Sequence, residues 1–202
     1  MQAFVLIDGG MCAMRIVFIG PPGVGKGTQC KRLAAHFKIA HLSTGEMLRS
    51  VDKESALGLL IGSYIDAGGL APDNLVMRIV RKRLVADDCK NGCLFDGFPR
   101  TLVQAESLDQ YMATSGDKLC IVISLEADTT ELIDRLLKRA EQESRVDDTA
   151  ETIQRRLEVF REKTAPVLDY YAAQGLVQPI DAMQSPDTIF NSICGQISRR
   201  CV

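Results

Sequence analysis

Residues 15–28 read Arg-Ile-Val-Phe-Ile-Gly-Pro-Pro-Gly-Val-Gly-Lys-Gly-Thr, an apolar run that leads directly into a glycine-rich loop. The apolar run 15–19 predicts a short buried strand, and residues 28–37 have a helical pattern. A strand, a loop of the form G-x-x-x-x-G-K and a helix in this order are typical of a phosphate-binding loop. The glycines leave backbone N–H groups uncovered, the helix start favours an anion, and Lys26 adds a positive charge. This stretch therefore predicts an α/β fold that holds the phosphates of a ligand.

The rest of the chain alternates short apolar runs with amphipathic stretches, which is the signature of a parallel sheet covered by helices. The candidate strands are 15–19, 39–42, 93–95, 119–125 and 176–180, and the candidate helices between them include 73–86, 129–139 and 148–174. Pro166 should kink or split the last of these helices. Ser185-Pro-Asp187 combines a cap residue, a proline and an acid, and predicts the start of the final helix.

Two segments interrupt this alternation. Residues 43–72 predict a mainly helical insert that is closed by Gly68-Gly69 and Pro72, whereas residues 139–148 are polar and lack a core-forming pattern. Both are typical of covers that move over a binding site. Residues 1–13 precede Met14, a second possible start, and we expect them to be an extension without a role in the fold.

Composition indicates a compact soluble enzyme. The 202 residues support one core, and 46% of them are hydrophobic and 25% charged. The net charge of −2 gives no reason to expect nucleic acid or a membrane surface as the main partner. No apolar stretch is long enough to cross a membrane, and the first residues do not resemble a signal peptide. The seven cysteines include no C-x-x-C pair, and Cys89 and Cys93 lack the partners of a metal site. We therefore expect reduced thiols and a cytoplasmic location.

Arginines recur where a phosphate ligand would need them. Asp96-Gly-Phe-Pro-Arg100 follows the third candidate strand, at the end of the strand where ligands bind in open α/β sheets. Arg135 and Arg139 lie one helical turn apart and repel each other, so local helix stability does not explain them. Arg145 lies in the polar cover and Arg156 in the next helix. Because a guanidinium can bind a phosphoryl group through two parallel hydrogen bonds, we expect these side chains to converge on phosphate oxygens.

Four motifs together resemble the adenylate kinase family of nucleoside monophosphate kinases. They are Gly20-Pro-Pro-Gly-Val-Gly-Lys-Gly-Thr-Gln29, Ser43-Thr-Gly-Glu-Met-Leu-Arg49, Asp96-Gly-Phe-Pro-Arg-Thr101 with Gln104, and Arg145-Val-Asp-Asp148. They occur in the family's order, and the resemblance covers roughly residues 14–200. It implies an α/β P-loop three-layer sandwich: a five-stranded parallel sheet with helices on both faces. The domain would span 14–202, with a helical insert for the nucleoside monophosphate at 43–72 and a short lid at 138–148.

The resemblance also implies a role for individual positions. The implied ATP-binding residues are Gly23, Val24, Gly25, Lys26, Gly27, Thr28, Arg135, Arg139 and Gln184. The implied AMP-binding residues are Thr44, Arg49, Gly69, Leu70, Ala71, Gly97, Phe98, Pro99, Arg100, Gln104, Arg145 and Arg156. The implied catalytic residues are Lys26, Arg100, Arg135, Arg139, Arg145 and Arg156. Asp96 would hold Mg²⁺ through water, and Asp147 and Asp148 would act at the hinge of the lid.

The implied reaction is MgATP + AMP ⇌ 2 ADP, with ATP, AMP and ADP as partners, Mg²⁺ as the cofactor and a monomer as the active form. The phosphate of AMP is already an anionic nucleophile, so catalysis would depend on positioning and charge neutralisation and would need no general base. We accordingly expect His36 and His41 to be packing or surface residues. The lid lacks the long insertion of other members, and no cysteine occurs between 121 and 193, so no structural zinc is expected.

Two alternatives remain at this point. A UMP/CMP kinase would share the fold and the phosphate chemistry, although Thr101 and Gln104 favour adenine. The amide of Gln104 can pair with N1 and N6 of adenine, but a flipped amide would suit guanine, so discrimination also needs fixed neighbours. Ala71 stands where a valine is common and could loosen the base site. A nucleotide-binding module without activity should have a damaged lysine or arginine set, and here all are present.

Overall fold

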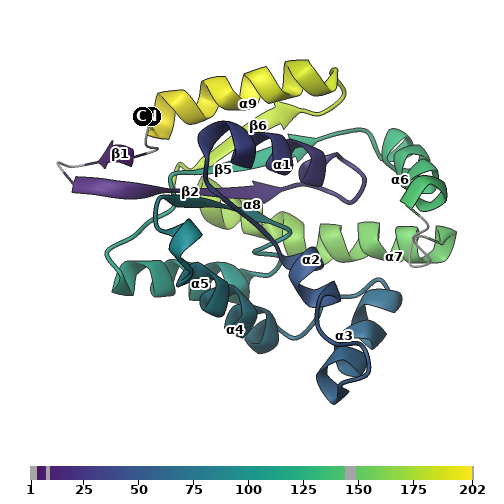
Figure 1. Ribbon diagram of the computed structural model, residues 1–202. Helices are drawn as coiled ribbons and strands as arrows, with labels where there is room; N and C mark the ends of the chain where they lie inside the picture. Colours follow the sequence, from purple (N-terminus) through teal and green to yellow (C-terminus); the bar gives the residue numbers. More distant parts are fainter. Residues whose placement is uncertain (1–3, 8–9, 144–148, 202) are drawn as a thin grey trace.

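Five parallel strands form the sheet of the computed structural model, which describes residues 4–7, 10–143 and 149–201 (Figure 1). The strands are β2 (Gly10–Ile19), β3 (Ala40–Ser43), β4 (Gly92–Asp96), β5 (Ile121–Glu126) and β6 (Val177–Asp181). Their order in the sheet is β3-β4-β2-β5-β6, as in an open α/β sheet whose connections leave the central strand in both directions. Because the strands are parallel, the carboxyl ends of β2, β3 and β4 meet at one edge. The predicted five-stranded parallel sheet is confirmed.

The N-terminal part of the chain differs from the expectation. Strand β1 (Phe4–Ile7) pairs antiparallel with the start of β2, with Phe4 opposite Ala13 and Ile7 opposite Gly10. Strand β2 therefore begins at Gly10, five residues before the predicted start at Arg15, because β1 supplies the backbone partners that residues 10–13 need. Within the expected extension, residues 10–13 thus continue the central strand and residues 4–7 pair with it.

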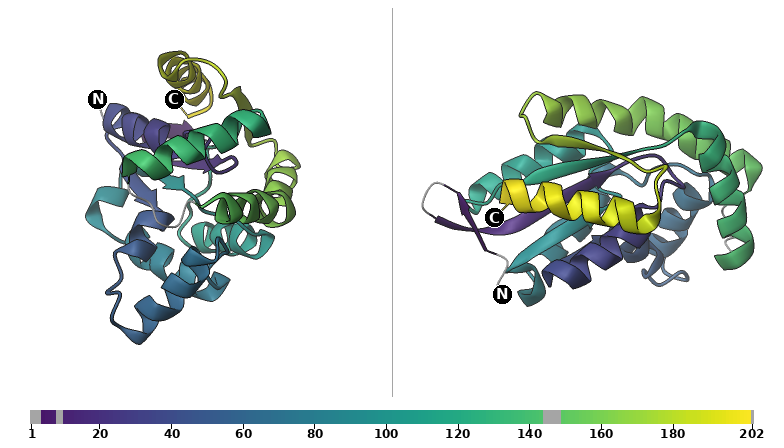
Figure 2. Two further views of the ribbon diagram at one scale, coloured as in Figure 1. Left: turned by 90° about the vertical axis from the view of Figure 1, so that its right-hand side faces the viewer. Right: turned by 90° about the horizontal axis from the view of Figure 1, so that it is seen from above.

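Helices cover both faces of the sheet (Figures 1 and 2). On one face lie α1 (Lys26–Phe37) and α9 (Pro186–Cys201), and on the other lie α4 (Asp73–Leu84), α5 (Leu102–Thr114) and α8 (Ala165–Ala172). Helices α6 (Thr129–Glu143) and α7 (Ala150–Val159) follow β5, and a short 3₁₀ helix (Asp87–Cys89) precedes β4. Within the described ranges, every helix is too short or too polar to span a bilayer.

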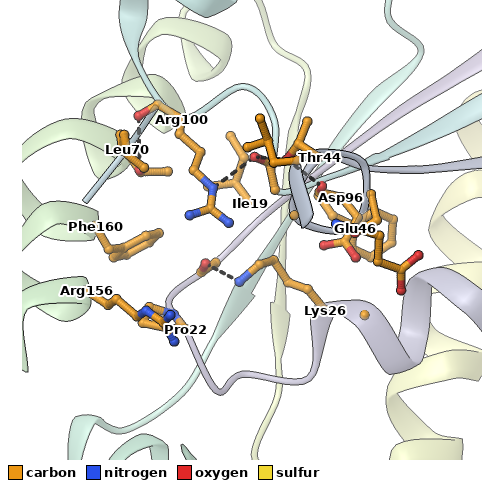
Figure 3. Close-up of a pocket in the computed structure, with 18 of the residues that line it drawn as sticks. Ile19, Pro22, Lys26, Thr44, Glu46, Leu70, Asp96, Arg100, Arg156 and Phe160 are labelled. Carbon is orange, nitrogen blue, oxygen red and sulfur yellow. Dashed lines mark hydrogen bonds between the residues drawn. The ribbon is translucent and has the colours of Figure 1, made fainter. Parts of the chain in front are cut away.

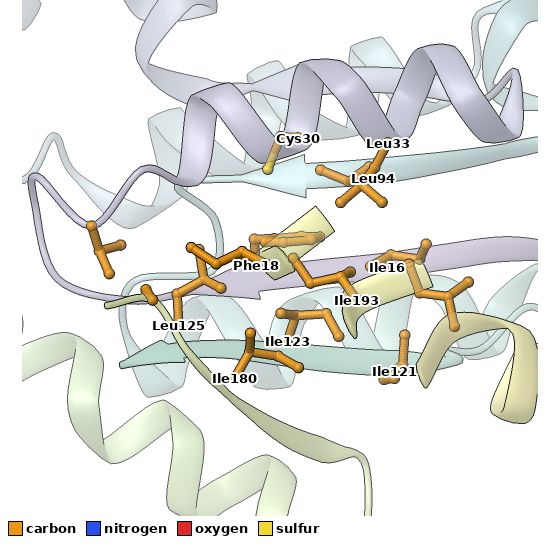
Figure 4. Packing of buried hydrophobic residues seen from close by; sticks show 14 of the residues in the cluster. Ile16, Phe18, Cys30, Leu33, Leu94, Ile121, Ile123, Leu125, Ile180 and Ile193 are labelled. Atoms are coloured by element: carbon orange, nitrogen blue, oxygen red, sulfur yellow. The ribbon is translucent and has the colours of Figure 1, made fainter. Parts of the chain in front are cut away.

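Alternating side chains of the strands fill two separate cores. Ile16 and Phe18 of β2 pack with α1 and α9, as Figure 4 shows, whereas Val17 and Ile19 pack with α4, α5 and α8. This alternation follows from the pleat of a strand that is buried on both faces. Burial of each large apolar side chain contributes about 1.5–3 kcal/mol, so the two cores fix the strand ends that carry the site.

The helix predicted over 148–174 is split at the position that proline requires. Helix α7 ends at Val159, residues 160–164 form a π-helical turn, and α8 starts at Ala165. Pro166 has no N–H to donate to the preceding turn, so regular α-helical bonding cannot pass through it. The start predicted for α9 is also confirmed, since the Thr188 N–H donates to Ser185 Oγ over 3.2 Å.

The segment predicted as an insert forms two helices outside the sheet layers (Figure 1). They are α2 (Thr44–Arg49) and α3 (Ala56–Asp66). Serine side chains cap both: Ser43 Oγ accepts from the Glu46 N–H, and Ser55 Oγ accepts from the Gly58 N–H. In the predicted lid, α6 continues to Glu143, and residues 144–148, which include Arg145, Asp147 and Asp148, lie outside the described residues.

Candidate nucleotide site

The glycine-rich loop connects β2 to α1 through backbone conformations that favour glycine. Gly23 has φ 83° and Gly25 has φ 94°, and Gly25 is the residue that precedes the first turn of α1. A Cβ at Gly23 would also lie 2.8 Å from the Leu132 carbonyl oxygen. Helix α1 begins at Lys26, two residues earlier than predicted, so its N-terminal N–H groups open directly onto the loop. This geometry is suited to an anion.

Lys26 lies inside this loop. Its Nζ donates to the carbonyl oxygens of Gly20 and Pro21 over 2.6 Å and 2.8 Å, and Figure 3 shows the side chain directed into the pocket. The charge of Lys26 also acts on Asp96 at the end of β4. A phosphate that entered the loop would meet this ammonium group together with the backbone N–H groups.

Asp96 is held ionised beside the loop. Burial alone would raise its pKa, but the contact with His41 and the charges of Lys26 and Arg100 outweigh burial, and the pKa lies below its ordinary value. His41 Nε2 is 3.2 Å from Asp96 Oδ2. The sequence pattern missed this contact and assigned His41 to packing or surface. The register of β3 beside β4, in which Ser43 is opposite Asp96, brings it about.

The described residues offer one group of possible metal ligands here. The ligand atoms of Cys30, His41 and Asp96 all lie within 4.8 Å of one another. Cys30 is fully buried in the apolar core, and burial raises the pKa of its thiol well above the ordinary value, so the sulfur is a neutral thiol. Mg²⁺ prefers oxygen ligands, and the Asp96 carboxylate, which lines the pocket, fits that preference.

Arginine side chains approach the same pocket from several elements. Arg100 Nε donates to the Gly97 carbonyl over 2.9 Å, and Arg49 and Arg156 lie close enough to lower its pKa. Arg100 is exposed to the open pocket; partial desolvation of its guanidinium is the largest cause of the lowered pKa, and the charge of Asp96 opposes it. Arg135 Nε donates to Glu131 Oε1 over 3.0 Å, and its Nη1 donates to the Ala182 carbonyl over 3.2 Å. The side chain of Arg139, like Arg145, lies outside the described residues.

These groups share one cavity of about 730 Å³ at the carboxyl edge of the sheet (Figure 3). Most positions singled out from the sequence line it: Gly23, Gly25, Lys26, Gly27, Thr28, Thr44, Arg49, Gly69, Leu70, Ala71, Asp96, Gly97, Pro99, Arg100, Gln104, Arg135 and Arg156. Val24 and Phe98 are buried in the cores behind the wall. Gln184 lies outside the lining and donates to Asp181 Oδ2 over 2.7 Å.

Some lining residues carried no sequence signal. Phe160 and Thr164 reach the pocket from the π-helical turn, and Figure 3 shows the Phe160 ring beside Arg156. Thr164 Oγ1 donates to the Arg100 carbonyl over 3.0 Å and so joins this turn to the loop after β4. Pro166 predicted a break in the helix, but the place of that break beside Arg100 is a property of the three-dimensional fold.

Comparison with known proteins gives a consistent result. The family model for adenylate kinase matches residues 18–176. The chain is 48% identical over 181 residues to an adenylate kinase of Rhodopirellula baltica, covering 90% of this chain and 93% of that relative. It is 43% identical over 179 residues to an adenylate kinase of Thermus thermophilus, covering 88% and 94%. An adenylate kinase of Bifidobacterium longum is 43% identical over 185 residues, covering 91% and 100%.

Proposed function

The chain belongs to the adenylate kinase family, and on that premise we propose how its pocket transfers the terminal phosphoryl group of ATP to AMP, giving two ADP. The observation that carries the proposal is the single cavity of about 730 Å³ that joins a phosphate loop to arginines from separate elements. A reaction between two anions needs such a concentration of positive charge, because the charge of the phosphates must be neutralised before they can approach.

The ATP phosphates bind at the loop. The N–H groups of residues 23–28 cradle them, and Lys26 exchanges the carbonyls of Gly20 and Pro21 for phosphate oxygens. Arg135 contacts the phosphates from α6, as Arg139 does one turn further on. Asp96 would hold Mg²⁺, which would supply positive charge to neutralise the phosphates. Val24 contributes its N–H, and we propose Gln184, which lies outside the pocket lining, as a contact of the ATP base.

AMP binds on the opposite wall, between the insert and the loop after β4. Arg49, Arg100 and Arg156 bind its phosphate, which is supported by their place in the lining of one pocket and by the closeness of Arg49 and Arg156 to Arg100. Gln104, with the backbone of residues 69–71 and 97–99, holds the adenine. Thr44 lines the pocket together with these arginines and would lie beside the AMP phosphate. Its Oγ1 donates to the Gly97 carbonyl over 2.8 Å.

The protein then contributes orientation and charge. The AMP phosphate attacks the terminal phosphorus of ATP without a general base, while Lys26, Arg100 and Arg156 stabilise the charge that spreads over the transferring group. Arg145 joins them from the lid. Closure of segments 43–72 and 138–148 excludes water and so limits hydrolysis of ATP.

Initial rates of phosphoryl transfer from MgATP to AMP, CMP, UMP and GMP test this function. We expect AMP to exceed the other acceptors by at least about a hundredfold in kcat/KM, which corresponds to roughly 2.7 kcal/mol. A faster reaction with CMP or UMP would instead favour a UMP/CMP kinase. Ala71 lines the base site, and a smaller side chain there than valine would lower the preference without reversing it.

We also propose a monomer in a reducing compartment, the cytoplasm. Cys30, Cys89, Cys93, Cys120, Cys194 and Cys201 are free thiols, which is usual where disulfides do not form. The large apolar side chains that are exposed among the described residues are spread over several helices and loops, which suits a chain that acts alone.

A further inference from the structure

Both polar atoms of the Gln104 side-chain amide are hydrogen-bonded to other residues of the protein. The Arg100 N–H donates to Gln104 Oε1 over 2.7 Å, and Gln104 Nε2 donates to Asp73 Oδ1 over 2.8 Å. The same Asp73 oxygen accepts from Thr101 Oγ1 over 3.1 Å, and Thr101 Oγ1 in turn accepts from the Gln104 N–H over 3.2 Å. Gln104 is buried, with 2% of its surface exposed. The side chain therefore has a fixed set of neighbours.

The chemistry of these neighbours permits only one orientation of the amide. A backbone N–H can only donate, and a carboxylate can only accept. Rotating the amide by 180° would place its NH₂ group against the Arg100 N–H and its carbonyl against the Asp73 carboxylate. Both contacts would be repulsive, and in a buried site neither could be relieved by water. The orientation of Gln104 is thus set from two sides.

We propose that Asp73 is a positioning residue that locks the Gln104 amide and thereby selects adenine over 6-oxopurines as the base of the phosphate acceptor. This inference rests on the proposed function, in which Gln104 contacts that base. Gln104 lines the pocket and Asp73 does not, so Asp73 acts through Gln104. It stands at the first position of α4, outside the lining of the pocket.

The locked amide still has bonding capacity to offer the ligand. One N–H of Nε2 and one lone pair of Oε1 remain after the contacts with Asp73 and Arg100. An adenine edge presents an acceptor at N1 and a donor at N6, which matches that pair. A 6-oxopurine presents a donor at N1 and an acceptor at O6, which opposes it at both atoms. A site that leaves such groups unpaired rejects the wrong base strongly.

The probe is IMP, because hypoxanthine has the reversed edge of guanine without its 2-amino group, so size is not a second variable. For the wild-type enzyme we expect kcat/KM for AMP to exceed that for IMP by at least about a hundredfold. If kcat/KM of the wild-type enzyme for AMP exceeds that for IMP by less than about tenfold, the orientation of the amide does not select the base. The proposal is then wrong, and no variant is needed to show it. A wild-type enzyme that does not phosphorylate AMP at all would instead refute the proposed function, which keeps the two failures distinct.

The variants are Asp73→Asn and Asp73→Ala. Asparagine, or water in the space left by alanine, can donate as well as accept, so the flipped amide loses one of its two repulsive contacts. We expect the AMP to IMP ratio to fall by about tenfold or more in both variants, with the KM for ATP changed by less than about threefold. The ratio should fall because kcat/KM rises for IMP as well as falling for AMP. A general loss of stability would not raise kcat/KM for IMP.

Asp109→Asn is the matched control. Asp109 lies in the middle of α5, outside the pocket lining, and accepts from Tyr170 Oη over 2.9 Å and from Gln174 Nε2 over 3.2 Å. This variant should lower the melting temperature and leave the AMP to IMP ratio unchanged. If the Asp73 variants also melt earlier but keep the wild-type ratio within twofold, Asp73 only joins α4 to α5 and the proposal is wrong.

Discussion

Lys26→Met is the most direct test of the phosphate site, because it removes one charge and keeps an unbranched side chain only one atom shorter. In the structure the Nζ group donates two hydrogen bonds, 2.6 Å to the Gly20 carbonyl and 2.8 Å to the Pro21 carbonyl. Water in the pocket, which Gly20 lines, can replace the ammonium group there. We therefore expect the loss of folding stability to stay below about 2 kcal/mol.

The loss of activity should be much larger. Removing a single electrostatic donor from a transition state costs about 2.7–4 kcal/mol, or about 10²–10³ in kcat. Lys26 carries a full charge in a loop built for phosphate, so we expect a fall of at least about a hundredfold. A stability loss below 2 kcal/mol corresponds to a fall in melting temperature below about 8 °C for a chain of this size.

The assay measures initial rates of ADP formation from MgATP and AMP with both substrates varied, together with thermal unfolding of the same samples. Lys90→Met is the control, because Lys90 is an exposed lysine whose Nζ lies 2.6 Å from Asp87 Oδ1, away from the pocket. It should keep wild-type activity. If Lys26→Met retains activity within tenfold of the wild type, Lys26 does not neutralise the transferring phosphoryl group and the reasoning fails.

Three further predictions follow from the same structure. Arg135→Met should lower kcat at least about a hundredfold but the melting temperature by only a few degrees, because its pair with Glu131 is partly exposed and contributes about 0–1 kcal/mol. Arg155→Met, which breaks a similar exposed pair with Glu158, should keep its activity. An active Arg135→Met enzyme or an inactive Arg155→Met enzyme would contradict the assignment. Arg15→Met should retain activity and lose about 3 kcal/mol, since Arg15 is buried and its Nε lies 2.6 Å from Asp117 Oδ2; an unchanged urea midpoint would show that the pair does not stabilise the fold. Two adenosines joined through five phosphates should slow amide hydrogen exchange in α2 and α3 more than in α9 and raise the melting temperature, and equal exchange with and without the saturating analogue would exclude closure of the insert.

The parts of the fold that were predicted correctly depend mainly on residues that are adjacent in the sequence. Buried parallel strands gave continuous apolar runs, so four of the five predicted strands agree with the structure to within about two residues at each end. Pro166 and Ser185 act through their own backbone neighbours, which is why the split helix and the start of α9 were predictable. The predicted start of strand β2 was five residues too late, because its first residues depend on pairing with β1.

The site was foreseeable only in part, because its side chains are set by contacts between distant residues. The glycine loop and the arginines have local motifs, and the structure brings most of them to one pocket. His41 beside Asp96 depends on the register of β3 with β4, and Thr164 beside Arg100 joins residues 64 positions apart. The sequence left the orientation of the Gln104 amide open, and Asp73, 31 positions away, supplies the neighbour that settles it.

The arrangement of charge explains why the pocket favours anionic ligands. Arg100 is exposed to the pocket, and partial desolvation together with the nearby charges of Arg156 and Arg49 lowers the pKa of its guanidinium. Asp96 lies beside these cations; burial would raise its pKa, but the contact with His41 and the charges of Lys26 and Arg100 lower it. A guanidinium does not release its proton at physiological pH, so these side chains stay charged and attract an anionic ligand. The phosphates of two nucleotides supply that negative charge, and binding energy gained in this way is available to draw the insert over the substrates.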